Sequence, residues 1–208
     1  MKKVISSLTV MFLVGLASMS PAQFLGQVST AKTQPAGNSL VGGYIGLQDD
    51  AFSFFGQYRY GFVQYFDGGL KFGFINLDDK AGVVFGGDLK YQILDDRIGD
   101  AFDFSLSGST EFAGTENRTV FSLGGNVIGS KSFKLRTGKS ISPYGKINLR
   151  FERDETERPF PFSDRVDTDF DIGGYFGADF EVGKNLSILG EFVFDDKFGF
   201  IFGLNYGF

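Results

Sequence analysis

The chain has 208 residues, of which 27 are Phe and 30 are Gly, and it contains no Cys, His or Trp. Without Cys or His it has no disulfide, thiolate metal site, cysteine nucleophile or Ser-His-Asp triad, which excludes most classes of hydrolase and metalloenzyme. The formal charge of −5 argues against a nucleic-acid partner, because such binding depends on Lys and Arg side chains that neutralise phosphates.

The first 22 residues have the pattern of a secretory signal peptide. Two lysines precede an apolar stretch from Val4 to Ala17, and Ser20 and Ala22 place small residues at the positions that a signal peptidase reads. We therefore predict that residues 1–22 are cleaved. The apolar stretch is short for a membrane-spanning helix, and no second stretch of about 18 apolar residues follows it.

A polar segment without clear periodicity follows the predicted cleavage site. Pro35 and Gly37 interrupt it, and we predict that residues 23–39 form an N-terminal segment on the periplasmic side of a membrane. From residue 40 onward, apolar and polar side chains alternate with a period of two, which is typical of β-strands. Residues 40–208 are therefore predicted to form one domain built from strands.

Ten segments fit the alternation. The last is the clearest, because it has large apolar side chains at every second position from Phe198 to Phe208 and mostly Gly and Asn between them. In chain order, the predicted strands are residues 40–48, 51–63, 66–76, 82–93, 102–112, 119–130, 140–152, 170–182, 186–194 and 198–208.

The apolar face of these strands is unsuited to a water-soluble barrel or sandwich. A soluble core mixes side chains of different sizes so that opposing layers interdigitate, whereas here one face is Phe on strand after strand. In a transmembrane barrel, the apolar face meets lipid and the polar face lines the interior. We therefore predict an all-β fold, a transmembrane antiparallel up-and-down β-barrel with ten strands. Eight strands are the alternative if the first pair merges.

The ending NLSILGEFVFDDKFGFIFGLNYGF resembles the terminal hairpin of small bacterial outer-membrane barrels, in the broad family of the outer membrane protein A barrel domain. The motif covers the last two strands, while the alternation covers residues 40–208. The resemblance implies outer-membrane lipid as the surroundings of the barrel and insertion by the barrel-assembly machinery, guided by the last strand. The side chains that match this insertion signal are Phe202, Leu204, Tyr206 and Phe208.

The polar face places many charged side chains inside the predicted barrel. Tight hairpins would bring Lys71 opposite Asp88 and Arg150 opposite Asp171, to within about two residues of register. We interpret these side chains as a charge network that fills a narrow lumen. Its members are Arg59, Lys71, Asp88, Lys90, Asp103, Glu111, Lys146, Arg150, Asp171, Asp179, Glu181 and Glu191, and the other inward acids are Asp67, Glu152 and Asp169.

Three classes of function fit this interior. The favoured hypothesis is a structural or surface-interacting barrel, and the alternative is a narrow cation-preferring pore, because inward acids outnumber inward bases. An enzyme that acts on envelope lipid or peptide is the third class, and the lack of His argues against it. Asp169 and Asp171 have only the ordinary spacing of inward positions, so we predict no catalytic residue, no metal and no cofactor.

The longest connector, residues 153–167, is predicted to lie on the external side. It carries Pro159, Phe160, Pro161 and Phe162 between charged residues. This loop either contacts a surface ligand or folds over the mouth of the barrel, and the sequence leaves both open.

Gly-Gly pairs recur along the predicted strands, at residues 42–43, 68–69, 86–87, 124–125 and 173–174. No predicted helix follows any of them, so they are not phosphate-binding loops. We interpret them as positions that make room for bulky neighbours and allow the strands to bend.

Overall fold

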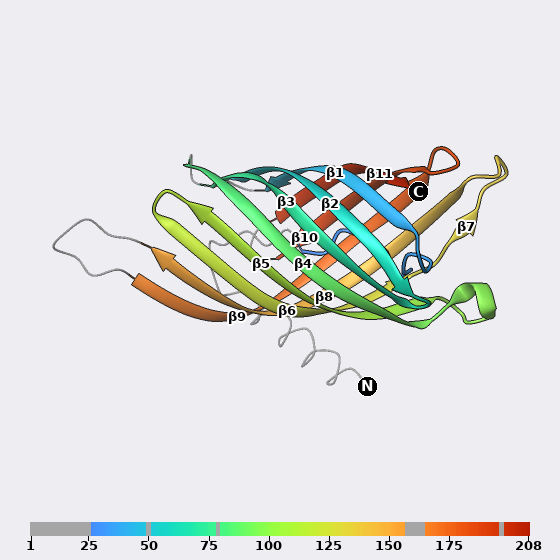
Figure 1. Cartoon of the computed structure of the whole chain (residues 1–208), viewed down its shortest axis with the longest axis horizontal. Helices are drawn as coiled ribbons and strands as arrows, with labels where there is room; N and C mark the ends of the chain where they lie inside the picture. Colours follow the sequence, from blue (N-terminus) through green and yellow to red (C-terminus); the bar gives the residue numbers. More distant parts are fainter. Residues whose placement is uncertain (1–25, 49–50, 78–79, 157–164, 196–197) are drawn as a thin grey trace, which may run out of the picture.

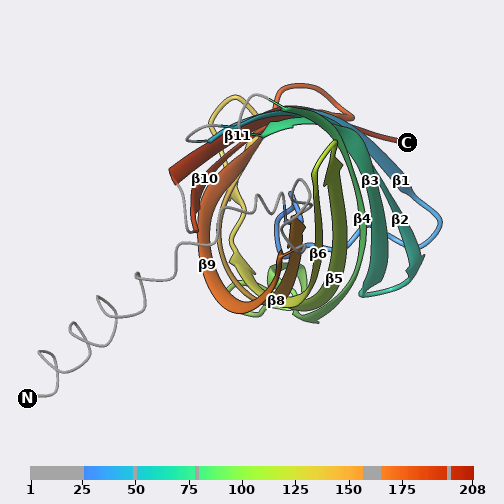
Figure 2. The ribbon, with the colours of Figure 1, turned by 90° about the vertical axis from the view of Figure 1, so that its left-hand side faces the viewer.

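The computed structural model describes residues 26–48, 51–77, 80–156, 165–195 and 198–208. These residues form a closed barrel of ten long strands (Figures 1 and 2). The predicted signal peptide and the residues Pro159, Phe160, Pro161 and Phe162 lie outside the described residues. The long strands are β1 (Ser39–Gln48), β2 (Ala51–Val63), β3 (Phe66–Leu77), β4 (Lys80–Leu94), β5 (Asp103–Thr115), β6 (Arg118–Ser130), β8 (Ser140–Thr156), β9 (Arg165–Glu181), β10 (Leu186–Phe194) and β11 (Phe198–Gly207).

Two short elements occupy the longer turns between these strands. A 3-10 helix, η1 (Asp96–Ile98), follows β4, and the two-residue strand β7 (Phe133–Lys134) pairs with the beginning of β8. Neither contributes a strand to the barrel wall. Among the described residues, no helix is long and apolar enough to cross a membrane.

The barrel closes through two pairings that complete the ring. Every long strand pairs antiparallel with its neighbour in the chain, β6 pairs with β8 across the β7 turn, and β1 pairs with β11. A path that starts at Gly177 of β9 and passes from each residue to its register partner on the next strand goes once around the ring. It returns to β9 at Arg165, twelve residues from its start. This stagger means that the strands tilt relative to the barrel axis. The prediction of a ten-stranded antiparallel barrel is confirmed.

The two ends of the barrel differ. At one end, which we call the terminal rim, the backbone groups of Ser39 and Phe208 bond to each other at 2.8 and 2.9 Å. At the other end, the hairpin rim, β8 and β9 project beyond their neighbours (Figure 1). Among the described residues, β9 pairs with β10 only from Gly174 onward, so the projecting part of β9 is bonded to β8 alone.

The two faces of the wall are chemically opposite. Large apolar side chains on the outer face are about half exposed, as at Phe74, Phe85 and Phe176. The inner face buries charged and polar side chains together with a small set of apolar ones that includes Phe55 and Leu189. Outward apolar and inward polar side chains are the arrangement of a barrel surrounded by lipid.

The segment that precedes β1 lies within the barrel. We expected residues 23–39 to form a periplasmic segment, but the structure places residues 26–34 among inward-facing side chains, with Gln27, Val28 and Ala31 fully buried (Figure 2). The segment enters at the terminal rim, where Gly37 adopts φ 79° and its N–H donates to the carbonyl of Gly61 at 2.8 Å. We call residues 26–34 the lumen segment.

An arginine on the outer face tests which face meets lipid. Phe85 is 52% exposed in the middle of β4, and Ile98 is 71% exposed in the turn beyond the strand. We expect Phe85→Arg to lower the free energy of unfolding by about 2–4 kcal/mol, because a charge near the bilayer midplane is poorly solvated. Urea titration in lipid vesicles measures this change. Ile98→Arg is the matched control and is expected to leave stability nearly unchanged; equal effects at the two positions would contradict the assignment.

Candidate functional site

The lumen of the barrel holds the candidate site, and its first cluster surrounds Arg59 on β2. The guanidinium lies 2.5 Å from a carboxylate oxygen of Asp67 on β3 and 2.8 Å from one of Asp88 on β4. Lys90 joins the same cluster, with its ammonium 3.7 Å from Asp67. A side chain at Gly69 would collide with Arg59, so this glycine provides room for the guanidinium. Arg59 and Lys90 are almost completely buried, so their charges depend on these partners.

A second cluster lies at Glu191 on β10. The carboxylate accepts a hydrogen bond from the hydroxyl of Tyr144 at 2.6 Å, and the ammonium of Lys146 lies 3.1 Å away. The Lys146 ammonium also lies 4.1 Å from the centre of the Tyr175 ring, a cation–π geometry. The side chains of Lys146 and Glu191 have no solvent exposure.

A third cluster surrounds Arg150 on β8, nearer the hairpin rim. Its guanidinium contacts the carboxylates of Glu152 at 3.2 Å, Asp171 at 3.6 Å and Asp195 at 2.5 Å. Arg150 and Asp171 are direct register partners, as the sequence pattern predicts. Asp195, the residue after β10, joins the cluster because it continues the inward-facing phase of Glu191 and Val193.

The predicted register of Lys71 and Asp88 holds to within its two-residue tolerance, but each side chain forms its ion pair with another residue. Asp88 lies opposite Gly69 rather than opposite Lys71, whose partner on β4 is Gly86. The two-residue difference in register brings Asp88 to Arg59, while Lys71 pairs with Glu111 on β5. A side chain at Gly86 would collide with the Lys71 stem, so the glycine lets the lysine extend across β4 to β5.

The remaining predicted network residues lie near the terminal rim. Asp103 accepts hydrogen bonds from Gln92 at 3.1 Å and from the backbone N–H of Asp96 at 3.0 Å. Asp179 accepts from Ser187 at 2.9 Å, and Glu181 accepts from Ser140 at 2.7 Å. Asp169, also predicted to face inward, is exposed on the projecting part of β9.

Three lysines of the network bind the lumen segment through its backbone. The Lys71 ammonium donates to the carbonyl of Gly26 at 2.6 Å, and that of Lys146 donates to the carbonyl of Gln27 at 2.7 Å. Lys90 donates to the carbonyls of Thr30 and Lys32, at 2.9 and 2.7 Å. Hydrogen bonds from charged donors are among the stronger ones, so these contacts hold the segment in place.

Other side chains of β2 to β6 complete the binding of the lumen segment. Pattern reasoning missed these contacts because the segment has no period and its partners are spread over the wall. They are Gln57 to the carbonyl of Val28 at 3.2 Å, Ser107 to the side chain of Gln27 at 2.6 Å, the N–H of Ala31 to Ser130 at 3.2 Å, the N–H of Thr33 to Gln92 at 3.0 Å and the N–H of Gln34 to Asp67 at 2.8 Å.

An acidic group at the terminal rim is the arrangement closest to a metal site among the described residues. Asp95, Asp96 and Asp103 have carboxylate oxygens within 4.8 Å of one another. Their charges are already compensated, because Lys32 of the lumen segment lies 3.0 Å from Asp96, and Arg97 lies 2.8 Å from Asp95. Hydrogen bonds from Arg97 hold the pKa of the Asp95 carboxyl below its ordinary value. The group therefore closes the β4–β5 turn.

The charged side chains of the interior are joined into a network of ion pairs and hydrogen bonds. Its carboxylates accept hydrogen bonds from Arg, Lys, Tyr or Ser partners, and its lysines bind carboxylates or backbone carbonyls. Such a network fixes the positions of its members and fills the space between them. The geometry brings together the predicted network residues in clusters, and it adds Tyr144, Tyr175 and Asp195 to them.

The Lys146–Glu191 pair allows a test of the network. We expect Glu191→Leu to destabilise the barrel by about 3–5 kcal/mol, because it leaves a buried ammonium without its carboxylate. The double variant Lys146→Met with Glu191→Leu is expected to recover most of that loss. Urea unfolding of the two single variants, Glu191→Leu and Lys146→Met, and of the double variant measures the coupling. If the two single losses simply add in the double variant, the pair is not coupled.

Three comparisons with known proteins were made. Scans against protein families and against curated proteins find no match. Among solved structures, the N-terminal β-barrel domain of Pseudomonas aeruginosa OprF is 10% identical over 84% of this chain and all of that one, with a TM-score of 0.44. The KdgM porin is 10% identical over 81% of this chain and 99% of that one, also at 0.44. Ail, the attachment invasion locus protein of Yersinia pestis, is 15% identical over 84% of this chain and all of that one, at 0.38.

These similarities concern the barrel alone, and the assignment rests on the chain's own geometry. A closed ring of ten antiparallel strands satisfies the backbone in hydrocarbon, and its outer face is apolar while its lumen is polar. The chain is a small integral outer-membrane β-barrel that resembles the outer membrane protein A barrel.

Proposed function

We propose that this outer-membrane barrel has a structural or surface-interacting role and that its charge-networked lumen does not conduct. The lumen segment carries the proposal. It is bonded by Lys71 of β3 and by Lys146 of β8, which lie four strands apart around the wall. A chain held from both sides of a ten-stranded barrel occupies the path that a solute would take.

A narrow cation-preferring pore is the alternative, and the excess of inward acids is the observation that favours it. In this lumen, however, the acids of the three clusters are engaged by bases. Asp67 and Asp88 contact Arg59, and Glu191 contacts Lys146. An acidic ring selects cations when its carboxylates face a water-filled path, so the pore hypothesis requires the lumen segment to leave.

The projecting hairpin supports the surface-interacting part of the proposal. Its described residues carry exposed charges, including the neighbouring pairs Arg153–Glu155 and Arg165–Asp167. Segments that project from a rigid barrel are frequent carriers of binding, and the ends of β8 and β9 project in this way, although residues 153–156 and 165–167 were expected to belong to a loop. A surface ligand that contacts these residues is part of the proposal, and catalysis is not.

Conductance in a planar bilayer tests whether the lumen is closed. We expect the folded mature chain to give no stable single-channel steps. A variant lacking residues 26–34 is expected to give steps that favour cations, because the acids of the lumen outnumber its bases. Heat-dependent gel mobility verifies that both proteins are folded. Equal unit conductance with and without the lumen segment would contradict the proposal.

Binding through the projecting hairpin requires a separate test. We expect the full chain to bind cells, matrix or envelope partners, and a variant in which a Gly-Ser linker replaces Glu155 to Ser163 to lose that binding. The wild-type barrel in the same vesicles is the reference. Unchanged binding by the variant would remove the surface-interacting role and leave the structural one.

A further inference from the structure

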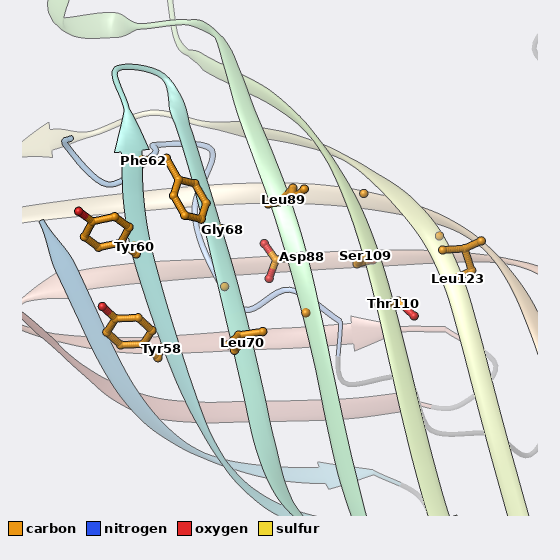
Figure 3. A pocket seen from close by; sticks show the side chains of 14 residues that line it. Tyr58, Tyr60, Phe62, Gly68, Leu70, Asp88, Leu89, Ser109, Thr110 and Leu123 are labelled. Carbon is orange, nitrogen blue, oxygen red and sulfur yellow. The ribbon is translucent and has the colours of Figure 1, made fainter. Parts of the chain in front are cut away.

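A groove of about 750 Å³ crosses the outer face of the barrel from β2 to β6. Figure 3 shows Tyr58 and Tyr60 on β2 at one end and Leu123 on β6 at the other. The outer face is otherwise lined by ridges of Phe, so a hollow of this size requires an explanation in the sequence. Its floor is the wall of the barrel itself, and Asp88, whose side chain joins the Arg59 cluster, is among the residues that line it.

Two adjacent rows of register partners form the floor of the groove. Each strand contributes one outward position to each row. Glycine stands at one of these positions in the first row, Gly87, and at three in the second, Gly68, Gly108 and Gly125, so four of the ten positions have no side chain. The first row is Tyr58, Leu70, Gly87, Thr110 and Leu123, and the second is Tyr60, Gly68, Leu89, Gly108 and Gly125.

Large side chains bound this floor on both sides. The next row toward the hairpin rim is aromatic on four consecutive strands, and the next row toward the terminal rim is also large and apolar. The first wall is Phe72, Phe85, Phe112 and Phe121, and the second is Phe66, Tyr91, Leu106 and Val127. The groove is therefore a trough between two ridges that runs across the strands.

The Gly-Gly pairs of the sequence explain why the trough lies here. In the pairs at 68–69, 86–87 and 124–125, one glycine faces the lumen and the other faces outward. The inward members make room for Arg59, Lys71 and Arg150, whose side chains approach within 3 Å of where a Cβ would stand. The outward members leave the trough. Each Gly-Gly pair thus makes room for a charged side chain on the lumen face and leaves a hollow on the lipid face.

We propose that this trough binds one acyl chain of a phospholipid from the leaflet at the terminal rim. The trough is continuous with the lipid-facing surface, so molecules that reach it come from the bilayer. Of the described residues that line it, none is Lys or Arg, so an acyl chain is favoured over a phosphate. Tyr60 and Phe62 lie near the end of β2 at the terminal rim, so the chain enters from that side.

Van der Waals packing is what favours an acyl chain in the trough over one elsewhere on the outer face, because the hydrophobic effect gives no driving force between apolar groups inside hydrocarbon. A chain on a flat or ridged wall contacts protein on one side, whereas a chain in a trough contacts the floor and both walls. Each additional atomic contact adds only a small dispersion energy, but the sum over a whole acyl chain is large. The trough is therefore expected to hold its lipid longer than the rest of the outer face does.

A single introduced tryptophan provides a clean reporter, since the chain has no Trp of its own. Tyr60→Trp places the reporter at the mouth of the trough. Tyr206→Trp is the control, because Tyr206 also faces outward near the terminal rim but lies on β11. The folded barrel in detergent is titrated with phosphatidylcholine brominated at mid-chain. We expect the Tyr60→Trp fluorescence to be quenched at an about tenfold lower lipid ratio than that of Tyr206→Trp, saturating near one lipid per barrel.

Filling the trough should remove this difference. A Cβ at Gly108 meets no atom within 4 Å, so Gly108→Leu is accommodated, and Thr110→Leu is a second filling variant. Gly43→Leu is the matched control, because Gly43 faces outward with equal space but lies on β1. The low-ratio phase at Tyr60→Trp is expected to disappear in either filling variant and to persist with Gly43→Leu.

Two results would overturn the proposal. One is a common quenching curve for both reporters, and the other is a low-ratio phase that survives both filling variants. Protection from quenching that grows with barrel concentration at a fixed lipid ratio would assign the trough to a second copy of the chain instead.

Discussion

The requirement that every backbone polar group be hydrogen-bonded inside hydrocarbon is the constraint on which this structure depends. The pairing of β1 with β11 and of β6 with β8 removes all free edges from the part of the wall that faces lipid. Closure with a stagger of twelve residues tilts the strands, and the 17-residue strands β8 and β9 extend beyond their neighbours. The same closure sorts each strand into two faces, so the alternation of the sequence becomes an apolar exterior and a polar interior.

The interior then has to satisfy the charges that it buries. It does so with clusters centred on Arg59, Arg150 and Glu191, and with the backbone of the lumen segment. The carbonyls of that segment give the lysines acceptors in addition to their carboxylates, so the same contacts that neutralise the interior also fill it. In the function we propose, closure of the path through the barrel follows from this satisfaction of charges. The glycines opposite Arg59 and Lys71 leave the space that these two side chains need to reach their partners.

The strands and their faces were predictable because alternation with a period of two is a local property, clearest from Phe198 to Phe208. The pairing of Arg150 with Asp171 was predictable because a hairpin relates them. The partner of Lys71 was not, since a difference of two residues in register moved Asp88 to Arg59. The position of the lumen segment was not predictable either, because it has no period and its contacts come from strands far along the chain. The trough that the outward-facing glycines form was also not predictable, because its position depends on the registers of five strands, β2 to β6.

The central claim is that alternate residues of each strand face lipid and lumen, and spin labelling along β5 tests it most directly. The chain has no native Cys, so single cysteines can be placed at each position from Phe104 to Thr110. We expect labels at Phe104, Leu106, Gly108 and Thr110 to be accessible to oxygen, which dissolves in lipid. Labels at Ser105, Ser107 and Ser109 should be shielded from it. An oxygen accessibility that does not alternate along these seven positions would contradict the account.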